Sequence, residues 1–267
     1  MITAGVDVGS LSIKAVLLAD REEVLGYSIL PTQPGIRELA EVAFNQALEN
    51  SHLSKDDVAY IVSTGYGRRL VPFSHGEVTE ITCHGKGAYW LHPEVRTIID
   101  IGGQDSKAIR VDSKGLVTNF VMNDKCAAGT GRFLEVMAHA LGVKLEKMGT
   151  FSLQAKKALD VSNTCTVFAE SEVISLIAGG NSKEDIVAGL HLAIAKRTVG
   201  MVERIGIVEK VAMTGGVAKN IGVVQAIESL LGVTLFIPEE PQIVGALGAA
   251  IVAVERYQDS LEAARKA

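Results

Sequence analysis

Apolar and polar residues alternate in the first segment of the chain, and the same alternation returns near its middle. Residues 6–16 read VDVGSLSIKAV and residues 99–109 read IDIGGQDSKAI, so Asp7 and Asp100 hold the same place in the two patterns. Each segment continues into a second alternating run, a polar turn (DREE or DSKG) and a third run (VLGYSI or LVTNFV). A period of two predicts strands, and repetition of a whole three-strand meander predicts two related α/β lobes.

Helical spacing and further apolar runs fill the rest of the chain. Apolar residues three and four apart form one stripe over residues 35–50, which predicts an amphipathic helix. The same spacing predicts helices at about residues 129–141, 168–178, 185–206, 219–231 and 245–257, and strands are expected in VAYIVSTGYG, KVAMTGG and VTLFIP. We expect an N-terminal lobe of residues 1–95 and a larger C-terminal lobe of residues 96–267, and the last helix could pack back on the first lobe.

Composition narrows the class of protein. Hydrophobic residues make up 48% of the chain and charged residues 21%, with a formal net charge of −5, which is ordinary for a globular protein and does not suggest a nucleic-acid partner. Charged residues interrupt the apolar segment 185–206, so we expect no membrane partner. The first residues alternate instead of forming a secretory signal, which favours a cytoplasmic location. Three cysteines in a reducing compartment point to burial or metal ligation.

The two Asp-Gly turns are candidate phosphate-binding hairpins. Gly9, Ser10 and Ser12 offer backbone amides and hydroxyls to phosphate oxygens, and Lys14 adds a positive charge. Gly102 and Gly103 repeat this arrangement in the second lobe. Asp7 and Asp100, each just before its turn, suit a Mg2+ ion held largely through water. The alternative is a pair of ordinary tight turns, with Lys14 and Lys107 as solvated strand residues.

A third element is needed for a base and ribose. Residues 211–220, VAMTGGVAKN, supply a strand, a Gly215-Gly216 turn and the start of a helix. We therefore expect a nucleotide to be held by two hairpins and this segment.

The segments DVGS, DIGGQD, MTGGVAKN and GALGAA resemble the phosphate-1, phosphate-2, adenosine and closing segments of the actin, hexokinase and Hsp70-chaperone ATPase superfamily. The resemblance implies a duplicated actin-like (ribonuclease H-like) ATPase fold, two α/β lobes with a nucleotide cleft between them, and ATP or ADP with Mg2+ as ligands. It implies these nucleotide-binding residues: Gly9, Ser10, Leu11, Ser12, Lys14, Gly102, Gly103, Gln104, Gly215, Gly216, Val217, Lys219 and Asn220. We expect these catalytic residues: Asp7 and Asp100 at the metal, and Gln104 and Asp105 near the γ-phosphate. Glu80 could orient the attacking water if its segment crosses the nucleotide cleft, and the alternative is a solvated or packing role.

More narrowly, STGYGR, TCHGKGA, IDIGGQD, MNDKCAAGTGRF and NTCTVFAESEVISL resemble the activators of 2-hydroxyacyl-CoA dehydratases. That family also takes in ATPase subunits of benzoyl-CoA reductase and reductases of double-cubane cluster proteins. Asn163 stands where the family more usually has Ser. The resemblance implies an ATPase that takes one electron from ferredoxin or flavodoxin and passes it to an iron-sulfur dehydratase or a double-cubane protein.

Cys126 and Cys165 each precede a predicted helix, where free backbone N–H groups favour thiolates. The resemblance implies a 4Fe-4S cluster, and because such a cluster takes four thiolates, two chains must share one in a homodimer. Cys83 is interpreted as a core cysteine in a helix that links the lobes. A nucleophilic cysteine would need a paired base, and His139 is only a distant candidate.

Two other functions fit the same superfamily fold. One is a small-molecule kinase of the amino-sugar type, and the other is an assembly or chaperone-like ATPase without redox chemistry. Within the narrower resemblance, an ATPase subunit of a benzoyl-CoA reductase is a further alternative. Iron in the purified protein would exclude the kinase and the chaperone.

Overall fold

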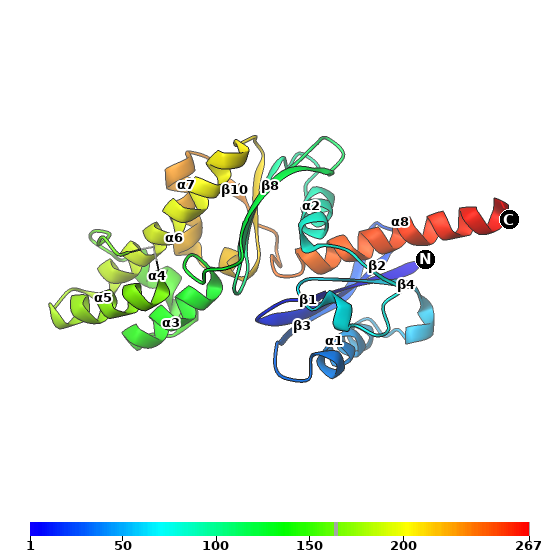
Figure 1. Cartoon of the computed structure of the whole chain (residues 1–267), viewed down its shortest axis with the longest axis horizontal. Coiled ribbons are helices and arrows are strands. Elements are labelled where there is room, and N and C mark those ends of the chain that lie inside the picture. Colours follow the sequence, from blue (N-terminus) through cyan, green and yellow to red (C-terminus); the bar gives the residue numbers. More distant parts are fainter. Residues whose placement is uncertain (163–164, 267) are drawn as a thin grey trace. The chain divides into compact units, whose positions relative to one another are not determined.

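The computed structural model describes residues 1–162 and 165–266, which form two compact units (Figure 1). Unit 1 comprises residues 1–94, 111–117 and 242–267, and unit 2 comprises residues 95–110 and 118–241. Asn163, noted above as a departure from the family pattern, lies outside the described residues.

Unit 1 contains a mixed five-stranded sheet in the order β3-β2-β1-β4-β5. β1 pairs antiparallel with β2, β2 pairs antiparallel with β3, and β1 pairs parallel with β4, so the first predicted meander is confirmed. The strands have these bounds: β1 Ile2–Val8, β2 Ser12–Ala19, β3 Glu23–Pro31, β4 Val58–Thr64 and β5 Gly76–Glu77.

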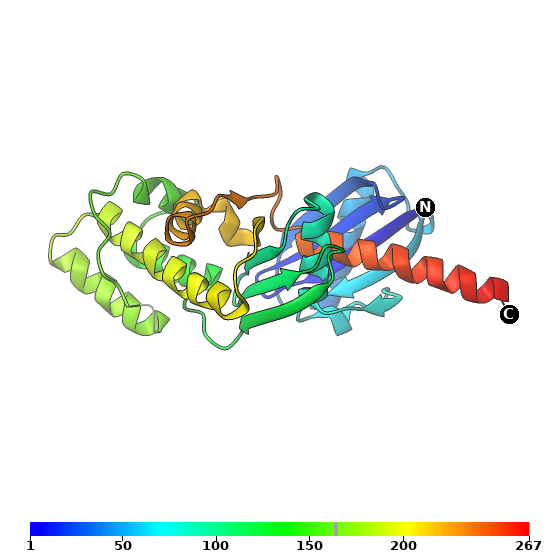
Figure 2. The same cartoon turned by 90° about the horizontal axis from the view of Figure 1, so that it is seen from above.

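Three α-helices cover this sheet, and the last of them along the chain is the red helix in Figure 2. They are α1 Ile36–Asn50, α2 Glu80–Leu91 and α8 Val244–Lys266. Two short 3-10 helices, η1 Lys55–Asp57 and η2 Arg68–Leu70, precede and follow β4. Strand residues that point to one face, such as Val6 and Leu17, pack with the apolar stripe of α1, whereas Val16 and Leu18 pack with α8 on the other face. The alternation in the sequence therefore reflects two buried faces with different helical partners.

α2 and α8 approach each other through glycines. A side-chain carbon at Gly248 would lie 1.8 Å from the backbone oxygen of Cys83, and one at Gly87 would lie 2.2 Å from the backbone oxygen of Val244. Only glycine allows this backbone separation. The segment GALGAA, which matches the closing segment of the superfamily pattern, therefore also has a packing role against α2.

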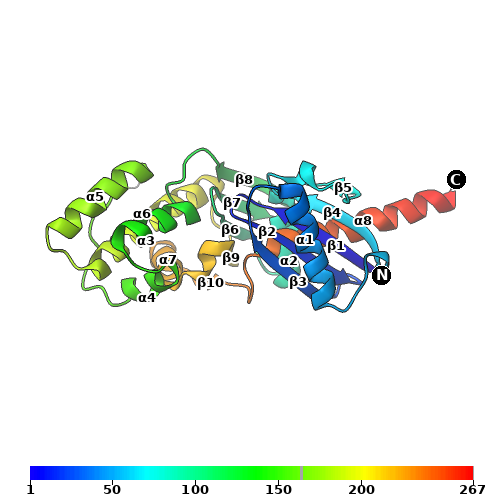
Figure 3. The same cartoon turned by 90° about the horizontal axis from the view of Figure 1, so that it is seen from below.

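Unit 2 repeats the sheet with the order β10-β9-β6-β7-β8 (Figure 3). β6 and β7 pair antiparallel, and β6 pairs parallel with β9, as β1 does with β4. The strands have these bounds: β6 Thr97–Ile101, β7 Ser106–Val111, β8 Val117–Asn123, β9 Val211–Thr214 and β10 Leu235–Phe236. The helices have these bounds: α3 Gly131–Leu141, η3 Leu145–Lys147, α4 Met148–Ser152, α5 Thr166–Ala178, α6 Lys183–Ile205, η4 Gly216–Lys219 and α7 Ile221–Leu231.

Some predicted boundaries were wrong. α8 was expected to end near Tyr257 but continues to Lys266, and α3 begins at Gly131 instead of about Gly129. α7 begins at Ile221, after a 3-10 turn, instead of Lys219. Among the residues with a described position, no helix combines the length and apolarity that crossing a membrane would require.

Candidate functional site

The first hairpin contains an ion pair between its two strands. Asp7 faces Lys14 in the β1–β2 register, and Nζ of Lys14 lies 3.1 Å from Oδ2 of Asp7. The N–H group of Gly9 donates to the carbonyl of Ser12 at 3.1 Å and closes the turn. Asp7 is buried, so the lysine offsets part of the cost of keeping its charge out of water.

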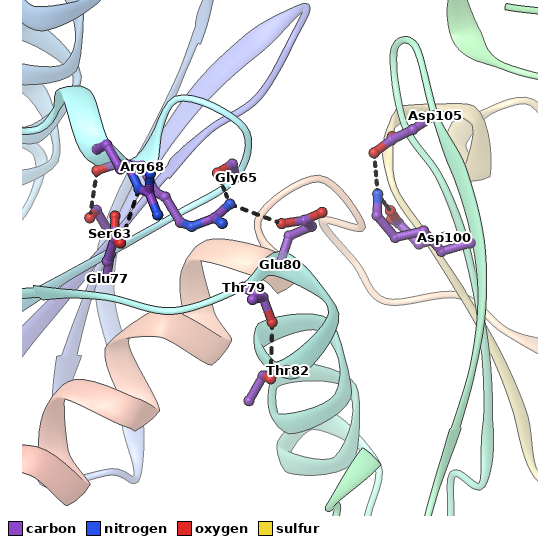
Figure 4. A network of polar contacts seen from close by, with 11 residues as sticks. Ser63, Gly65, Arg68, Glu77, Thr79, Glu80, Thr82, Asp100 and Asp105 are labelled. Carbon is purple, nitrogen blue, oxygen red and sulfur yellow. Dashed lines mark hydrogen bonds and ion pairs between the residues drawn. The ribbon is translucent and has the colours of Figure 1, made fainter. Parts of the chain in front are cut away.

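The second hairpin repeats this geometry atom by atom. Asp100 faces Lys107 with Nζ 3.3 Å from Oδ2, and the N–H group of Gly102 donates to the carbonyl of Asp105 at 2.9 Å. Lys107 also pairs with Asp105, and only 2% of its surface is exposed (Figure 4). Lys107 is therefore not a solvated strand residue, and that alternative was wrong for it. Gln104 is exposed at the tip of the turn.

A second repeated pair was missed in the sequence. Thr64 and Thr214 end the parallel strands and face Asp7 and Asp100 in the two registers. The glycine that follows each threonine has φ of 84°. A side-chain carbon at Gly65 would lie 2.5 Å from Oδ1 of Asp7, and one at Gly215 would lie 2.8 Å from Oδ1 of Asp100. The Thr-Gly pair at the end of both apolar runs was the available signal. The glycine of each pair lets the chain turn beside the buried carboxylate.

The predicted adenosine segment forms a strand, a turn and a helix cap. η4 follows Gly215, and Oδ1 of Asn220 accepts from the N–H groups at the start of α7. The side chain of Val217 lies in the core of unit 2, and Nζ of Lys219 lies 2.7 Å from Oε2 of Glu240. Gly216 and the backbone of the turn are therefore the groups best suited to contact a ligand.

A buried histidine contacts the side chain that caps α7. His191 on α6 is 1% exposed, and burial lowers its pKa to about 4. Its Nε2 lies 3.2 Å from Nδ2 of Asn220. A neutral imidazole can accept a hydrogen bond from that amide, which leaves the amide oxygen to cap α7.

This arrangement predicts acid sensitivity. The unfolded chain binds a proton at His191 with a pKa near 6.5, whereas the folded chain does so only near 4, so the free energy of unfolding should fall as the pH drops from about 6.5 to about 4. The contribution of this one group is about 3 kcal/mol. Denaturant titrations at several pH values should show a steeper acid loss in the native chain than in His191→Gln, and parallel profiles would contradict the prediction.

Glu80 is the first residue of α2 and is 9% exposed. Nη1 of Arg68 lies 3.7 Å from its Oε2 and donates to the carbonyl of Gly65 at 3.0 Å (Figure 4). The arginine therefore connects Glu80 to the turn beside Asp7 within unit 1. This placement makes Glu80 a carboxylate held near the first hairpin, and its predicted catalytic role stays a prediction.

The three cysteines have different environments. Cys83 is fully buried on α2, and desolvation raises its pKa to about 12, so its thiol stays protonated and the core interpretation is confirmed. Cys165 is the N-cap residue of α5, as expected. Cys126 was expected at a helix N-terminus, but it lies in the loop after β8, before the N-cap residue Thr130 of α3. Cys165 therefore lies beside the free N–H groups of its helix, whereas Cys126 does not. His139, in the last turn of α3, is exposed.

Cys126 and Cys165 carry thiols, which are the usual ligands of iron-sulfur clusters. Both thiols are partly exposed on unit 2, unlike Cys83, so a second molecule could reach them. Within residues 1–162 and 165–266, no group of three or more His, Cys, Asp or Glu side chains is gathered as a self-contained metal site. Two thiolates per chain fit a cluster that takes its other two ligands from a partner.

The second hairpin is bonded directly to the helix that follows Cys126. The N–H group of Gly131 donates to the carbonyl of Gly102 at 2.9 Å, and that of Arg132 donates to the carbonyl of Gly103 at 2.8 Å. A side chain at Gly131 would lie 3.2 Å from the oxygen of Gly102, so glycine permits the close approach. Within unit 2, the start of α3 therefore follows the position of this hairpin.

Comparison with known proteins identifies the family to which this chain belongs. Residues 4–253 match the BadF/BadG/BcrA/BcrD ATPase family. The activator of lactoyl-CoA dehydratase from Anaerotignum propionicum is 49% identical, with 97% of this chain and 99% of that protein covered.

Two solved structures share the fold. The (R)-2-hydroxyglutaryl-CoA dehydratase component A of Acidaminococcus fermentans has a TM-score of 0.93 and 45% identity, with 97% of this chain and 99% of that chain covered. The activator of the 2-hydroxyisocaproyl-CoA dehydratase from Clostridium difficile, with bound ADPNP, has a TM-score of 0.93 and 41% identity, covering 98% and 97%. The predicted two-lobed actin-like α/β fold and the family resemblance are thereby confirmed. The chain belongs to the BadF/BadG/BcrA/BcrD ATPase family.

Proposed function

We propose that the protein is an ATP-dependent one-electron reductase that activates an iron-sulfur enzyme of the 2-hydroxyacyl-CoA dehydratase type. It takes the electron from ferredoxin or flavodoxin in the cytoplasm and works as a homodimer. The acceptor is such a dehydratase or a double-cubane cluster protein. Identity over nearly the full length to an activator of lactoyl-CoA dehydratase supports this assignment.

The observation that carries the proposal is the bonding of the second hairpin to α3. Gly102 and Gly103 are proposed phosphate ligands, and their carbonyls accept from the first N–H groups of α3. The loop before α3 carries Cys126. A change at the phosphates can therefore reach a cluster ligand through two hydrogen bonds and the four loop residues between Cys126 and Gly131.

Nucleotide binding is assigned to the two repeated hairpins and to the turn after β9. In the hairpins, ATP or ADP is bound by Gly9, Ser10, Leu11, Ser12, Lys14, Gly102, Gly103 and Gln104. In the turn it is bound by Gly215 and Gly216 and by the backbone of Val217, Lys219 and Asn220. Asp7 and Asp100 hold Mg2+ through water, because both are carboxylates beside a phosphate-facing turn. Gln104, Asp105 and Glu80 are the candidates for sensing the γ-phosphate and orienting the attacking water.

Cys126 and Cys165 of two chains would hold one 4Fe-4S cluster, which supplies a one-electron carrier when bound. ATP is needed because electron transfer to the acceptor is uphill. For one electron, roughly 59 mV of unfavourable potential is a factor of ten in the equilibrium. ATP hydrolysis can offset several such factors.

The test measures the cluster potential with ADP and with a non-hydrolysable ATP analogue. Anaerobically prepared protein should contain iron, and its potential should differ between the two nucleotides. In Gly131→Val, the side chain would push α3 away from the carbonyl of Gly102, so the difference should shrink while iron and nucleotide binding remain.

Gly200→Val is the matched control, because nothing lies within 4 Å of a side-chain carbon at Gly200 on α6. It should keep the nucleotide-dependent difference. An iron-free protein that phosphorylates a sugar would instead establish the kinase alternative. A potential that is the same with both nucleotides in the native chain would remove the coupling from the proposal.

A further inference from the structure

The loop that carries Cys126 is held by the side chain that precedes it. Asn123 is the last residue of β8, and its Nδ2 donates to the carbonyl of Cys126 at 2.9 Å. This hydrogen bond fixes the backbone of Cys126 relative to the sheet. Asp124 and Lys125, between them, are exposed.

Arg197 of α6 contacts the same loop on both sides of Cys126. Its Nη2 lies 3.5 Å from Oδ1 of Asn123, at the long end of the hydrogen-bond range. On the other side, Gly129 has φ of 85°, and a side-chain carbon there would lie 2.8 Å from Cδ of Arg197. The arginine stem therefore occupies the space that a side chain at position 129 would need, and its guanidinium reaches back to Asn123.

We propose that Arg197 is a positioning residue for Cys126 and that its charge raises the reduction potential of the cluster bound there. This inference rests on the proposed function, since it takes Cys126 as a cluster ligand. Arg197 projects from α6, a helix of 23 residues with a largely buried apolar face, so the anchor is rigid. The contacts with Asn123 and Gly129 transfer that rigidity to the loop.

The electrostatic effect follows from the charge of the reduced state. Reduction adds one negative charge to a cluster that is already held by thiolates, and a nearby positive charge stabilises that form. Arginine stays protonated at any physiological pH, and Arg197 is half-buried, which limits screening by solvent. A twofold dimer would place two such charges around one cluster.

The first test compares two arginines of the same helix. Redox titration of the ADP-bound protein, followed by electron paramagnetic resonance, gives the midpoint potential. Arg197→Gln should disfavour reduction about tenfold, which corresponds to a midpoint about 59 mV more negative. Arg204→Gln, an exposed position in the last turn of α6, should change it less than about twofold. Equal potentials in the two variants would overturn the electrostatic part.

The second test isolates positioning from charge. Arg197→Lys keeps the charge but cannot reach Asn123 with the same planar group, and Asn123→Ala removes the bond to Cys126 while keeping the arginine. Hydrogen exchange of residues 124–130 should become about fivefold faster in Arg197→Lys, which loses about one hydrogen bond, and faster still in Asn123→Ala, which loses the bonds to both Cys126 and Arg197. Arg197→Lys should nevertheless keep the native potential. Unchanged exchange would overturn the positioning part.

The exchange measurement also separates this inference from the proposed function. It can be made on iron-free and iron-loaded chains alike, so it still decides the role of Arg197 if Arg197→Gln fails to fold. Absence of iron from the native chain would reject the cluster and with it the effect on potential. Iron present with Arg197→Gln behaving like Arg204→Gln would reject only the effect assigned to Arg197.

Discussion

Asp7→Asn should lower ATP hydrolysis about a hundredfold while leaving the fold intact. We propose that Asp7 lies beside Mg2+. A metal ion there would stabilise developing charge by several kcal/mol, and about 1.4 kcal/mol is a factor of ten in rate. Loss of the carboxylate should also weaken the Mg2+ dependence of nucleotide binding, measured with a fluorescent ATP analogue. The folded state should survive, because asparagine has nearly the same shape as aspartate and 12% of the Lys14 side chain already reaches solvent.

Asp259→Asn is a suitable control, since Asp259 is an exposed residue near the end of α8. It should retain native hydrolysis and Mg2+ dependence. Thermal unfolding of both variants checks that any loss is not a loss of structure. Native hydrolysis in a folded Asp7→Asn protein would remove Asp7 from the metal site.

The repeated hairpins explain why so much of the fold could be predicted. A strand-turn-strand unit needs its alternation, its glycine and its buried charge pair at fixed spacing, so a duplicated hairpin leaves the same letters twice. Asp7 with Lys14 and Asp100 with Lys107 form equivalent ion pairs in equivalent registers. The repeat of these residues could be predicted from local spacing, but the ion pairs themselves were not predicted, because Lys14 was expected to serve the phosphates.

The second repeated feature lacked that local spacing. Thr64 and Thr214 reach their aspartates through parallel pairing, after connections of different length in the two units. Two letters, Thr-Gly, are too few to establish a repeat at a different interval. Each threonine comes to lie beside its aspartate only because the strands pair, so the equivalence of Thr64 and Thr214 can be recognised only once the strand order is known.

Element ends were hardest to predict where no apolar face marks them. The final part of α8, after Tyr257, is exposed and rich in strong helix formers, so the helix continues without the periodic pattern that packing would impose. Cys126 illustrates the opposite case. AAGTG contains small residues that are compatible with a helix start, but Gly129 adopts a positive φ and Thr130 becomes the N-cap residue, which delays α3. The thiol therefore lies on a loop whose geometry depends on distant residues.

Replacement of either Cys126 or Cys165 should remove the cluster altogether. A 4Fe-4S cluster takes four thiolates, and a homodimer offers Cys126 and Cys165 twice, so the native protein should contain about 2 Fe per chain. Cys126→Ala or Cys165→Ser should contain almost no iron and should dimerise more weakly, because ligation contributes to association. Iron and labile-sulfide assays with sedimentation measure both effects.

The choice of serine at position 165 separates ligation from capping. Serine is a favourable N-cap residue, so α5 should keep its start in Cys165→Ser, and any loss of iron then comes from the missing thiolate. Cys83→Ala is the control within the same chain: its thiol is buried and protonated, with a pKa raised to about 12, so the variant should lose some stability but keep iron and dimer. About 4 Fe per chain in a monomer, or full iron content without Cys126, would show that the cluster has other ligands.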